Sequence, residues 1–326
     1  MNNYRELSNF VYNYNRINFR NITNNSLALN KLIKNEYFSN RSFKKEILNS
    51  FEKFSSVITA HIQNSISLIK NSLTQNSKEG YLSVYDSLLT SETPFVCGLG
   101  TTHVFETSLI LHHIWGVPYI PASSLKGVCR QVAFWKLVEE KNINEADLDD
   151  FQKKFYGDLV DDEKILPYQL LFGAQDFKGL LLFLDAYPNI GNSNTNNQNN
   201  NKLFKLDIMN PHYSGYYSDP EGKTPPADWE NPTPIFFLTV KEGVDFRFVV
   251  LFDKWRWDKI KKDDIIINDK KIKKNNNISR EIDNIIANDN IKQNKNNNFF
   301  ENILKEALTF YGVGSKTRLG YGSFKV

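Results

Sequence analysis

The order of strand-like and helix-like segments after residue 90 constrains the fold of this chain more than any other feature of its sequence. β-branched and aromatic residues predict extended structure over 94–120 and again at 179–188 and 234–252. Apolar residues at helical spacing predict one helix at about 124–139 and another at 299–311, before a short final strand. The resulting order of strand, helix, strand, strand, helix and strand is that of the split βαβ arrangement. We therefore predict an α+β chain with a ferredoxin-like core.

The N-terminal part of the chain has helical character instead. Apolar residues recur at steps of three and four through 45–73, and the polar residues between them are expected to face water. Residues 1–44 are less regular and are expected to hold shorter helices. Gly80 is a plausible helix cap. We therefore predict a helical extension over 1–80 and a core over 81–326.

Two insertions are expected within this core, at about 189–233 and 258–298. The first contains an Asn-rich run at 191–201, which predicts a mobile loop. The second is rich in Lys, Asp, Asn and Ile, and we expect a peripheral helix with mobile ends over 261–298. The strand-like region between the insertions is expected to be two strands joined at Glu242–Gly243.

Composition excludes several classes of protein. The chain has 326 residues, of which 40% are hydrophobic and 13% aromatic, so it can bury a substantial core. The formal net charge is only +3, so any basic surface must be local. Cys97 and Cys129 stand alone, which argues against a disulfide scaffold and a structural zinc site. No long apolar run and no secretory layout appear, so we expect a soluble cytoplasmic protein.

The glycine-rich stretch "GVGSKTRLGYG" at 312–322 is the first candidate site. Its glycines, among them Gly312 and Gly314, permit positive φ and the close approach of a ligand. Successive amide groups in such a loop can bind anions, and the segment between Ser315 and Arg318 adds charge and hydroxyl groups. It follows a helix and opens a strand, so it is not a P-loop. The alternative is a glycine turn that serves packing alone.

The stretch "PASSLKGVCR" is the second candidate. Ser123 or Ser124 can cap the predicted helix, whose N-terminus attracts phosphate. Lys126 and Arg130 are four residues apart and share a helix face. The alternative is an ordinary capped helix with a solvated basic face.

The stretch "DIMNPHYSGYY" is the third candidate. Tyr213, Tyr216 and Tyr217 stand beside His212 and are expected either to stack on bases or to form a protein interface.

Histidines and carboxylates give weaker signals. His103 lies near Glu106 and is a candidate general base for RNA cleavage. His112 and His113 are adjacent in a predicted strand, so their rings are expected on opposite faces, which disfavours a shared metal. His61 is expected on the polar side of the long helix.

The acidic residues Asp176, Asp185 and Asp207 come from separate segments, although Asp185 could approach Asp207 in the fold. Their spacing does not predict a two-metal centre, so neither a metal nor another cofactor is expected.

Four stretches together resemble a known family: "GVPYIPASSLKGVCR", "FGAQDFKGLLLFLDAYP", "DIMNPHYSGYY" and "GVGSKTRLGYG". They resemble the RAMP superfamily of CRISPR-associated proteins and, within it, the sixth subunits of Cmr-type (type III-B) effector complexes. The resemblance covers about 94–257 and 299–326. Ala122 stands where the family usually has glycine, a change that should still fit the turn.

This resemblance implies an RRM-type, ferredoxin-like core that binds CRISPR RNA within a ribonucleoprotein for antiviral defence. It implies contact with the 3′ portion of that RNA, with target RNA, and with the backbone RAMP and small helical subunits. The residues expected to contact RNA are Ser123, Ser124, Lys126, Arg130, Gly312, Gly314, Ser315, Lys316, Thr317 and Arg318.

The resemblance also bears on catalysis. In the family, target RNA is cleaved by an Asp of the backbone subunit, in the loop between the first strand and first helix. The matching segment here, roughly 103–122, contains no Asp, which implies a non-catalytic role. The alternative is a RAMP endoribonuclease that processes CRISPR RNA with His103 as general base.

Overall fold

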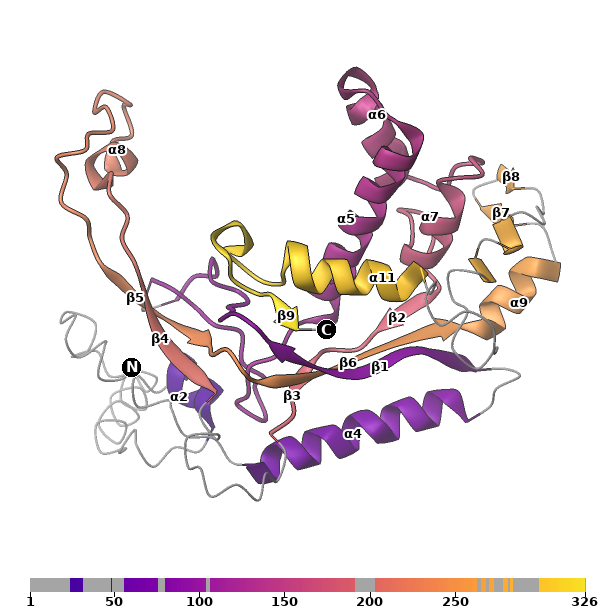
Figure 1. Ribbon diagram of the computed structural model, residues 1–326, viewed down its shortest axis with the longest axis horizontal. Helices are drawn as coiled ribbons and strands as arrows, with labels where there is room; N and C mark the ends of the chain where they lie inside the picture. Colours follow the sequence, from indigo (N-terminus) through magenta and orange to yellow (C-terminus); the bar gives the residue numbers. More distant parts are fainter. Residues whose placement is uncertain are drawn as a thin grey trace, which may run out of the picture.

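A computed structural model gives the fold of the chain (Figure 1). It describes residues 24–31, 48, 56–75, 80–103, 106–190, 203–262, 265–267, 270–272, 278–280, 282–283 and 299–325.

The centre of the molecule is an antiparallel sheet. Its strands are β1 (Tyr81–Ser91), β2 (Leu181–Phe183), β3 (Tyr187–Pro188), β6 (Asp245–Asp253) and β9 (Phe324–Lys325). Their order is β2-β6-β1-β9, with β3 also paired to β6, and every pairing is antiparallel. The mixed α/β architecture expected from the sequence is therefore confirmed.

Helices cover both faces of this sheet (Figure 1). α5 (Ala122–Lys141), α6 (Glu145–Tyr156), α7 (Leu166–Phe172) and α11 (Phe299–Glu306) lie on one side, and α4 (Ser56–Thr74) lies on the other. β6 is consequently buried almost continuously, and it has the apolar sequence of a strand covered on both faces.

A two-stranded arm extends from the sheet (Figure 1). It consists of β4 (Phe204–Met209) and β5 (Ile235–Val240), with α8 (Ser214–Ser218) in the segment between them. We refer to residues 204–240 as the arm. An isolated bridge between Phe95 and Val240 joins its base to the core.

Shorter elements complete the fold. They are α2 (Asn25–Lys31), α9 (Lys254–Lys262), the hairpin of β7 (Ile265–Ile267) with β8 (Lys270–Ile272), a π-helical turn η4 (Ala307–Tyr311) and a 3₁₀ turn η5 (Thr317–Leu319). Among the described helices, none has the length and apolar character needed to cross a membrane.

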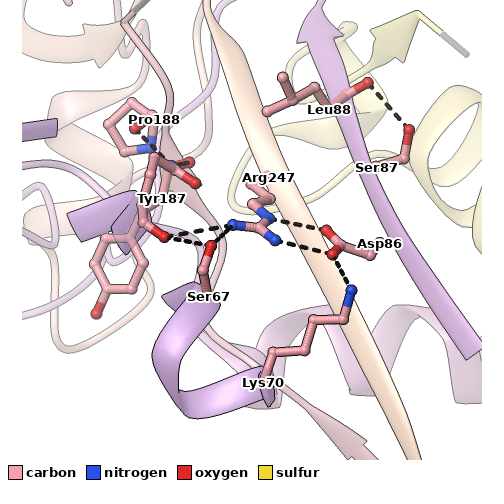
Figure 2. A network of polar contacts seen from close by, with 9 residues as sticks. Ser67, Lys70, Asp86, Ser87, Leu88, Tyr187, Pro188 and Arg247 are labelled. Carbon is pink, nitrogen blue, oxygen red and sulfur yellow. Dashed lines mark hydrogen bonds and ion pairs between the residues drawn. The ribbon is translucent and has the colours of Figure 1, made fainter. Parts of the chain in front are cut away.

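A network of ionic contacts fixes α4 to the sheet (Figure 2). Asp86 of β1 accepts two hydrogen bonds from Arg247 of β6, at 2.8 and 2.9 Å, and one from Lys70 of α4, at 2.6 Å. Arg247 also donates to the Ser67 hydroxyl at 2.8 Å. Burial alone would raise the pKa of Asp86, but the hydrogen bonds from Arg247 and Lys70 outweigh it and lower that pKa. We call Lys70, Asp86 and Arg247 the Asp86 clamp.

α4 occupies the later part of the helix predicted at 45–73. Ile62 and Ile66 of α4 are buried, as the periodicity predicts, whereas Ile69 is 50% exposed. Of residues 45–55, the part of this predicted helix that precedes α4, only residue 48 is among the described residues.

The predicted strands at 94–120 are wrong. This segment makes only isolated bridges, and its apolar residues Leu109 and Leu111 enter the core from irregular backbone. The first strand is β1, which pairs with β6 from Tyr81–Asp253 to Thr90–Asp245. The sequence did not predict β1 because polar residues such as Asp86 interrupt its apolar pattern. In the structure, Asp86 is hydrogen-bonded by cations from other elements.

The two strands joined at Glu242–Gly243 are confirmed as β5 and β6, although β5 pairs with β4 and β6 with β1. A further expectation needs correction. Residues 265–272 contain the β7–β8 hairpin where a helix was expected, and helical residues follow at 278–280 and 282–283. The Asn-rich run at 191–201 lies outside the described residues.

Candidate nucleic-acid interface

The C-terminal loop, residues 312–322, lies directly on residues 94–96, whose Phe95 makes the bridge to the arm. The Ser315 N–H donates to the Val96 carbonyl at 2.8 Å, and the Gly322 N–H donates to the Pro94 carbonyl at 3.0 Å. The Val313 N–H closes the loop on Gly322 at 3.0 Å. Most of the segment between the predicted helix at 299–311 and the C-terminus is therefore loop, and the final strand β9 contains only Phe324 and Lys325.

Several glycines of the loop are required by close backbone packing. Gly314 has φ +91°, and a Cβ there would lie 2.5 Å from the Val96 carbonyl oxygen. Gly322 has φ +85°, and its Cβ would lie 2.1 Å from the Val313 oxygen. Gly312 is buried with φ +72°, and its Cβ would meet the Tyr321 oxygen at 2.9 Å. Packing thus explains these three glycines without any ligand.

The cations of the loop are presented differently. Lys316 adopts a left-handed backbone conformation with φ 63°, and its ammonium lies 5.8 Å from the centre of the Phe237 ring. Arg318 is exposed, and Ser315 and Thr317 are half-buried. Within the described part of the chain, neither Lys316 nor Arg318 has a carboxylate partner.

Tyr321 anchors the loop to the arm. Its hydroxyl donates to Asp207 of β4 at 2.7 Å, and its ring lies 6.4 Å from that of Phe237 in β5. Burial, followed by the hydrogen bond to Asp207 and its negative charge, raises the pKa of Tyr321 to about 12. Asp207 therefore has a structural partner.

The start of α5 differs from the expected serine cap. Pro121 is the capping residue, and Ser123 and Ser124 lie within the first turn, the former exposed and the latter half-buried. The Ala122 N–H donates to an Asp185 carboxylate oxygen at 2.7 Å. Asp185 thus satisfies part of the helix terminus, whereas Asp207 bonds Tyr321, so the two carboxylates have separate partners.

The two cations of α5 that were expected to contact RNA have different surroundings. Arg130 donates to the Phe155 carbonyl at 3.1 Å, and its guanidinium lies 4.7 Å from the Tyr156 ring centre, so it ties α5 to α6. Lys126 is half-buried, and burial lowers its pKa, with further lowering by the charges of Arg130 and Lys178. Lys178, 52 residues beyond Lys126, is a cation that sequence spacing could not associate with it.

The C-terminal loop and the start of α5 border the same segment. A Cβ at Gly314 would lie 3.3 Å from the Cys97 sulfur, so the loop rests on Cys97. On the other side Cys97 is close enough to Tyr119 to influence it: burial raises the pKa of Tyr119, and Asp185 and Cys97 raise it further. Both predicted stretches also lie on the α5 and α11 side of the sheet (Figure 1).

The aromatic stretch lies on the arm, and Figure 1 shows α8 at its far end. The Tyr213 hydroxyl donates to Asp228 at 3.1 Å, whereas His212 is exposed. Tyr216 is 44% exposed. Trp229 belongs to the same tip and is 85% exposed. It lies outside the candidate stretch at 207–217, so the sequence did not indicate it.

The histidines also depart from expectation. His103 contacts the Leu29 carbonyl of α2 through Nε2 at 3.2 Å. The rings of His112 and His113 do not point to opposite faces, because they lie in a turn and stack at 4.9 Å. His61 is exposed, as predicted. Among the described residues, no three His, Cys, Asp or Glu side chains are grouped as metal ligands would be.

Comparison with known proteins places this geometry in context. The family model of the RAMP superfamily matches residues 88–325. The CRISPR system Cmr subunit Cmr6 of Pyrococcus furiosus is 33% identical over 192 residues, which cover 49% of this chain and 55% of the relative. Cmr6 of Saccharolobus solfataricus is 26% identical over 174 residues, covering 52% and 46% of the two chains. The chain thus spans about half the length of the curated relatives it matches.

A solved structure agrees on the fold. A chain from the cryo-EM structure of the type III-B Cmr-beta bound to cognate target RNA superposes with a TM-score of 0.53 at 20% identity, over 99% of this chain and 86% of that chain. This identity is low, so the likeness concerns the fold alone. The family match nevertheless extends from β1 to β9, and the chain therefore belongs to the RAMP superfamily, with Cmr6 subunits among its relatives.

Proposed function

We infer that this chain is a non-catalytic, RNA-binding subunit of a type III-B CRISPR effector, and that it holds the 3′ portion of the CRISPR RNA. The observation that carries this proposal is that three cations of the C-terminal loop and α5, Lys126, Lys316 and Arg318, have no carboxylate partner among the residues described. Relatives named as Cmr6 support the assignment to such a complex.

The core that carries these cations is proposed to be ferredoxin-like. α5 links β1 to β2 and α11 links β6 to β9, and the strand order β2-β6-β1-β9 is the one in which each helical connection skips one strand. Both connecting helices then lie on the same face. The salt bridge between Lys136 of α5 and Glu306 of α11 supports this pairing.

The proposed mode of binding is a backbone clamp. Lys316 and Arg318 would meet phosphates from one side and Lys126 from the other, with hydroxyl donors from Ser123 and Thr317. Such contacts position a strand without reading its bases, as a guide of variable sequence requires. Arg130 contributes by holding α6 against α5, because its guanidinium is already engaged there.

The arm is the proposed contact with a neighbouring subunit. Tyr216 and Trp229 are exposed at its tip, and large aromatic side chains are enriched in protein interfaces. Base stacking by His212, Tyr213 and Tyr216 is the alternative use of the same tip.

Catalysis by this chain is not part of the proposal. His103, the candidate general base, contacts a carbonyl of α2, and the candidate acids Asp185 and Asp207 have separate partners. Incubation of the purified chain with repeat RNA in the absence of metal should leave the RNA intact. Specific cleavage that His103→Ala abolishes would establish the endoribonuclease instead.

The central test is purification of the tagged chain from its native cell, followed by crosslinking. We expect it to retain RNAs of varied sequence together with other effector subunits, and to crosslink RNA at the peptide containing Lys316 and Arg318. If the chain co-purified with other subunits but gave no RNA crosslink at the C-terminal loop, the loop would serve packing alone and the RNA-binding role would be refuted.

A further inference from the structure

Residues 111–118 form a closed turn between β1 and α5, which we call the histidine turn. The His112 N–H donates to the Val117 carbonyl at 2.8 Å, and the Gly116 N–H returns to the His112 carbonyl at 2.7 Å. Gly116 has φ +66°, and a Cβ there would lie 2.6 Å from the backbone nitrogen of Asn25. The turn is therefore fixed internally and also packed closely against the start of α2.

The rings of this turn are stacked. The centre of the His112 ring lies 4.3 Å from that of Trp115 and 4.9 Å from that of His113, with interplanar angles of 21° in both pairs. The His112 ring is held in place because its Nδ1 accepts hydrogen bonds from the N–H groups of Ile114 and Trp115, each at 3.3 Å. In the neutral ring the proton is therefore on Nε2.

His113 is the exposed member of the stack. The Asn24 side-chain amide donates to the carbonyls of His113 and Ile114 at 3.0 and 2.8 Å. These bonds hold the backbone of the tip from the α2 side while the His113 ring faces solvent. The exposed ring is thus ordered in advance, and a planar group could bind to it without ordering a flexible side chain first.

The histidine turn connects to the candidate nucleic-acid interface through packed aromatic rings. Trp115 contacts Tyr187 at 5.5 Å, and Tyr187 stacks on Tyr119 at 5.4 Å. Tyr187 is buried, and so is Cys97, on which Gly314 of the C-terminal loop rests. The rings therefore anchor the histidine turn in the core that also supports the C-terminal loop, and they leave His113 exposed.

We propose that His113 is a base-stacking platform that receives one unpaired nucleobase of the RNA bound by this chain. The inference rests on the proposed RNA-binding role. A single exposed ring at the end of a fixed stack offers one planar face, which suits a base better than the broad contact of a protein partner. Every base has such a face, so the platform accepts any guide sequence.

The test uses the 326-residue chain with His113 replaced by Ala, Phe or Lys, and a single-stranded RNA of mixed sequence as the probe. Base stacking predicts that His113→Ala weakens RNA binding by roughly 5- to 100-fold. His113→Phe should restore most of the affinity because it keeps a ring, and His113→Lys should not. The control is His61→Ala, which removes an exposed histidine from α4, on the face of the sheet opposite α5 and α11, and should change nothing.

Inorganic polyphosphate, which has charge but no bases, separates this inference from the proposed function. His113→Ala and His113→Phe, which add no charge, should bind polyphosphate as the wild type does. Equal RNA affinities for wild type and His113→Ala, or rescue by Lys and not by Phe, would overturn the platform while leaving RNA binding intact. The platform would also be overturned if the His113→Ala chain kept its RNA affinity but no longer co-purified with other subunits. A wild-type chain that binds neither RNA nor polyphosphate would refute both proposals.

Discussion

The Asp86 clamp and the C-terminal loop place cations on opposite sides of one sheet and use them in opposite ways. In the clamp, two cations share one carboxylate, and all three side chains are largely buried between α4, β1 and β6. In the C-terminal loop, Lys316 and Arg318 lack a carboxylate partner among the residues that the structure describes. There, backbone hydrogen bonds and glycines hold the chain. Charge stabilises the fold in the first region and remains available for a polyanion in the second.

Removal of the shared carboxylate should give the largest effect. Asp86→Ala leaves Arg247 and Lys70 in a partly buried site without a counter-charge, which should lower the free energy of unfolding by about 3 kcal/mol. Urea denaturation measures the change. The matched control is Glu242→Ala, which breaks an exposed pair with Lys205 and should cost less than about 1 kcal/mol. Equal losses in the two variants would mean that the clamp is no stronger than a surface pair.

A substitution that disturbs the backbone of the C-terminal loop should also lower the free energy of unfolding. Gly322→Ala forces a side chain against the Val313 oxygen at positive φ, so we expect a loss of about 2 kcal/mol or more. Gly320→Ala is the control, because Gly320 has a similar φ of +86° but open space around it, and its cost should be about 1 kcal/mol. A similar melting temperature for both variants would contradict the packing argument.

Neutralising the loop should change RNA binding and leave the fold intact. Lys316→Ala combined with Arg318→Ala should weaken affinity for single-stranded RNA and reduce the slope of log K against log salt by about 1.4. Fluorescence anisotropy over a range of salt concentrations measures both. Lys259→Ala with Lys262→Ala on α9 removes the same charge elsewhere and serves as the control. An unchanged slope in the loop variant would count against direct phosphate contact.

The pH dependence of stability should be the smallest effect. The pKa of Asp86 is lowered in the folded chain, so the clamp contributes fully above the pKa of an unfolded Asp, near 4, and is lost as the pH falls through the lower folded value. Urea midpoints of the wild type should therefore decline below about pH 4 more steeply than those of Asp86→Asn. Parallel curves would indicate that the ionised carboxylate adds little.

The sequence predicted those parts of the fold that depend on local pattern. The helix that became α5 and the apolar run that became β6 were both recognisable, because burial on one or both faces leaves a periodic or continuous apolar signal. β1 was missed because Asp86 interrupts its pattern, and the cations that satisfy Asp86 come from residues 16 positions before it and 161 after it.

The sequence indicates candidate site residues but not how the fold holds them. The glycines at 312–322 indicated a close approach, yet the sequence could not show that Val96 is what Gly314 approaches. Nor could spacing reveal that Lys178 lies near Lys126. The stack of His112 on His113 was hidden by the mistaken assignment of a strand, in which neighbouring side chains diverge.

The hydrogen bond from Tyr321 to Asp207 has a consequence for assembly. It joins the loop that carries Lys316 and Arg318 to the strand at the base of the arm, and Lys316 itself lies over Phe237 of the adjacent strand. A subunit that docks on the arm and a polynucleotide seated on the loop would therefore act on one mechanical unit. If one of them changes the affinity of the chain for the other, thermodynamic reciprocity requires that both affinities change by the same factor.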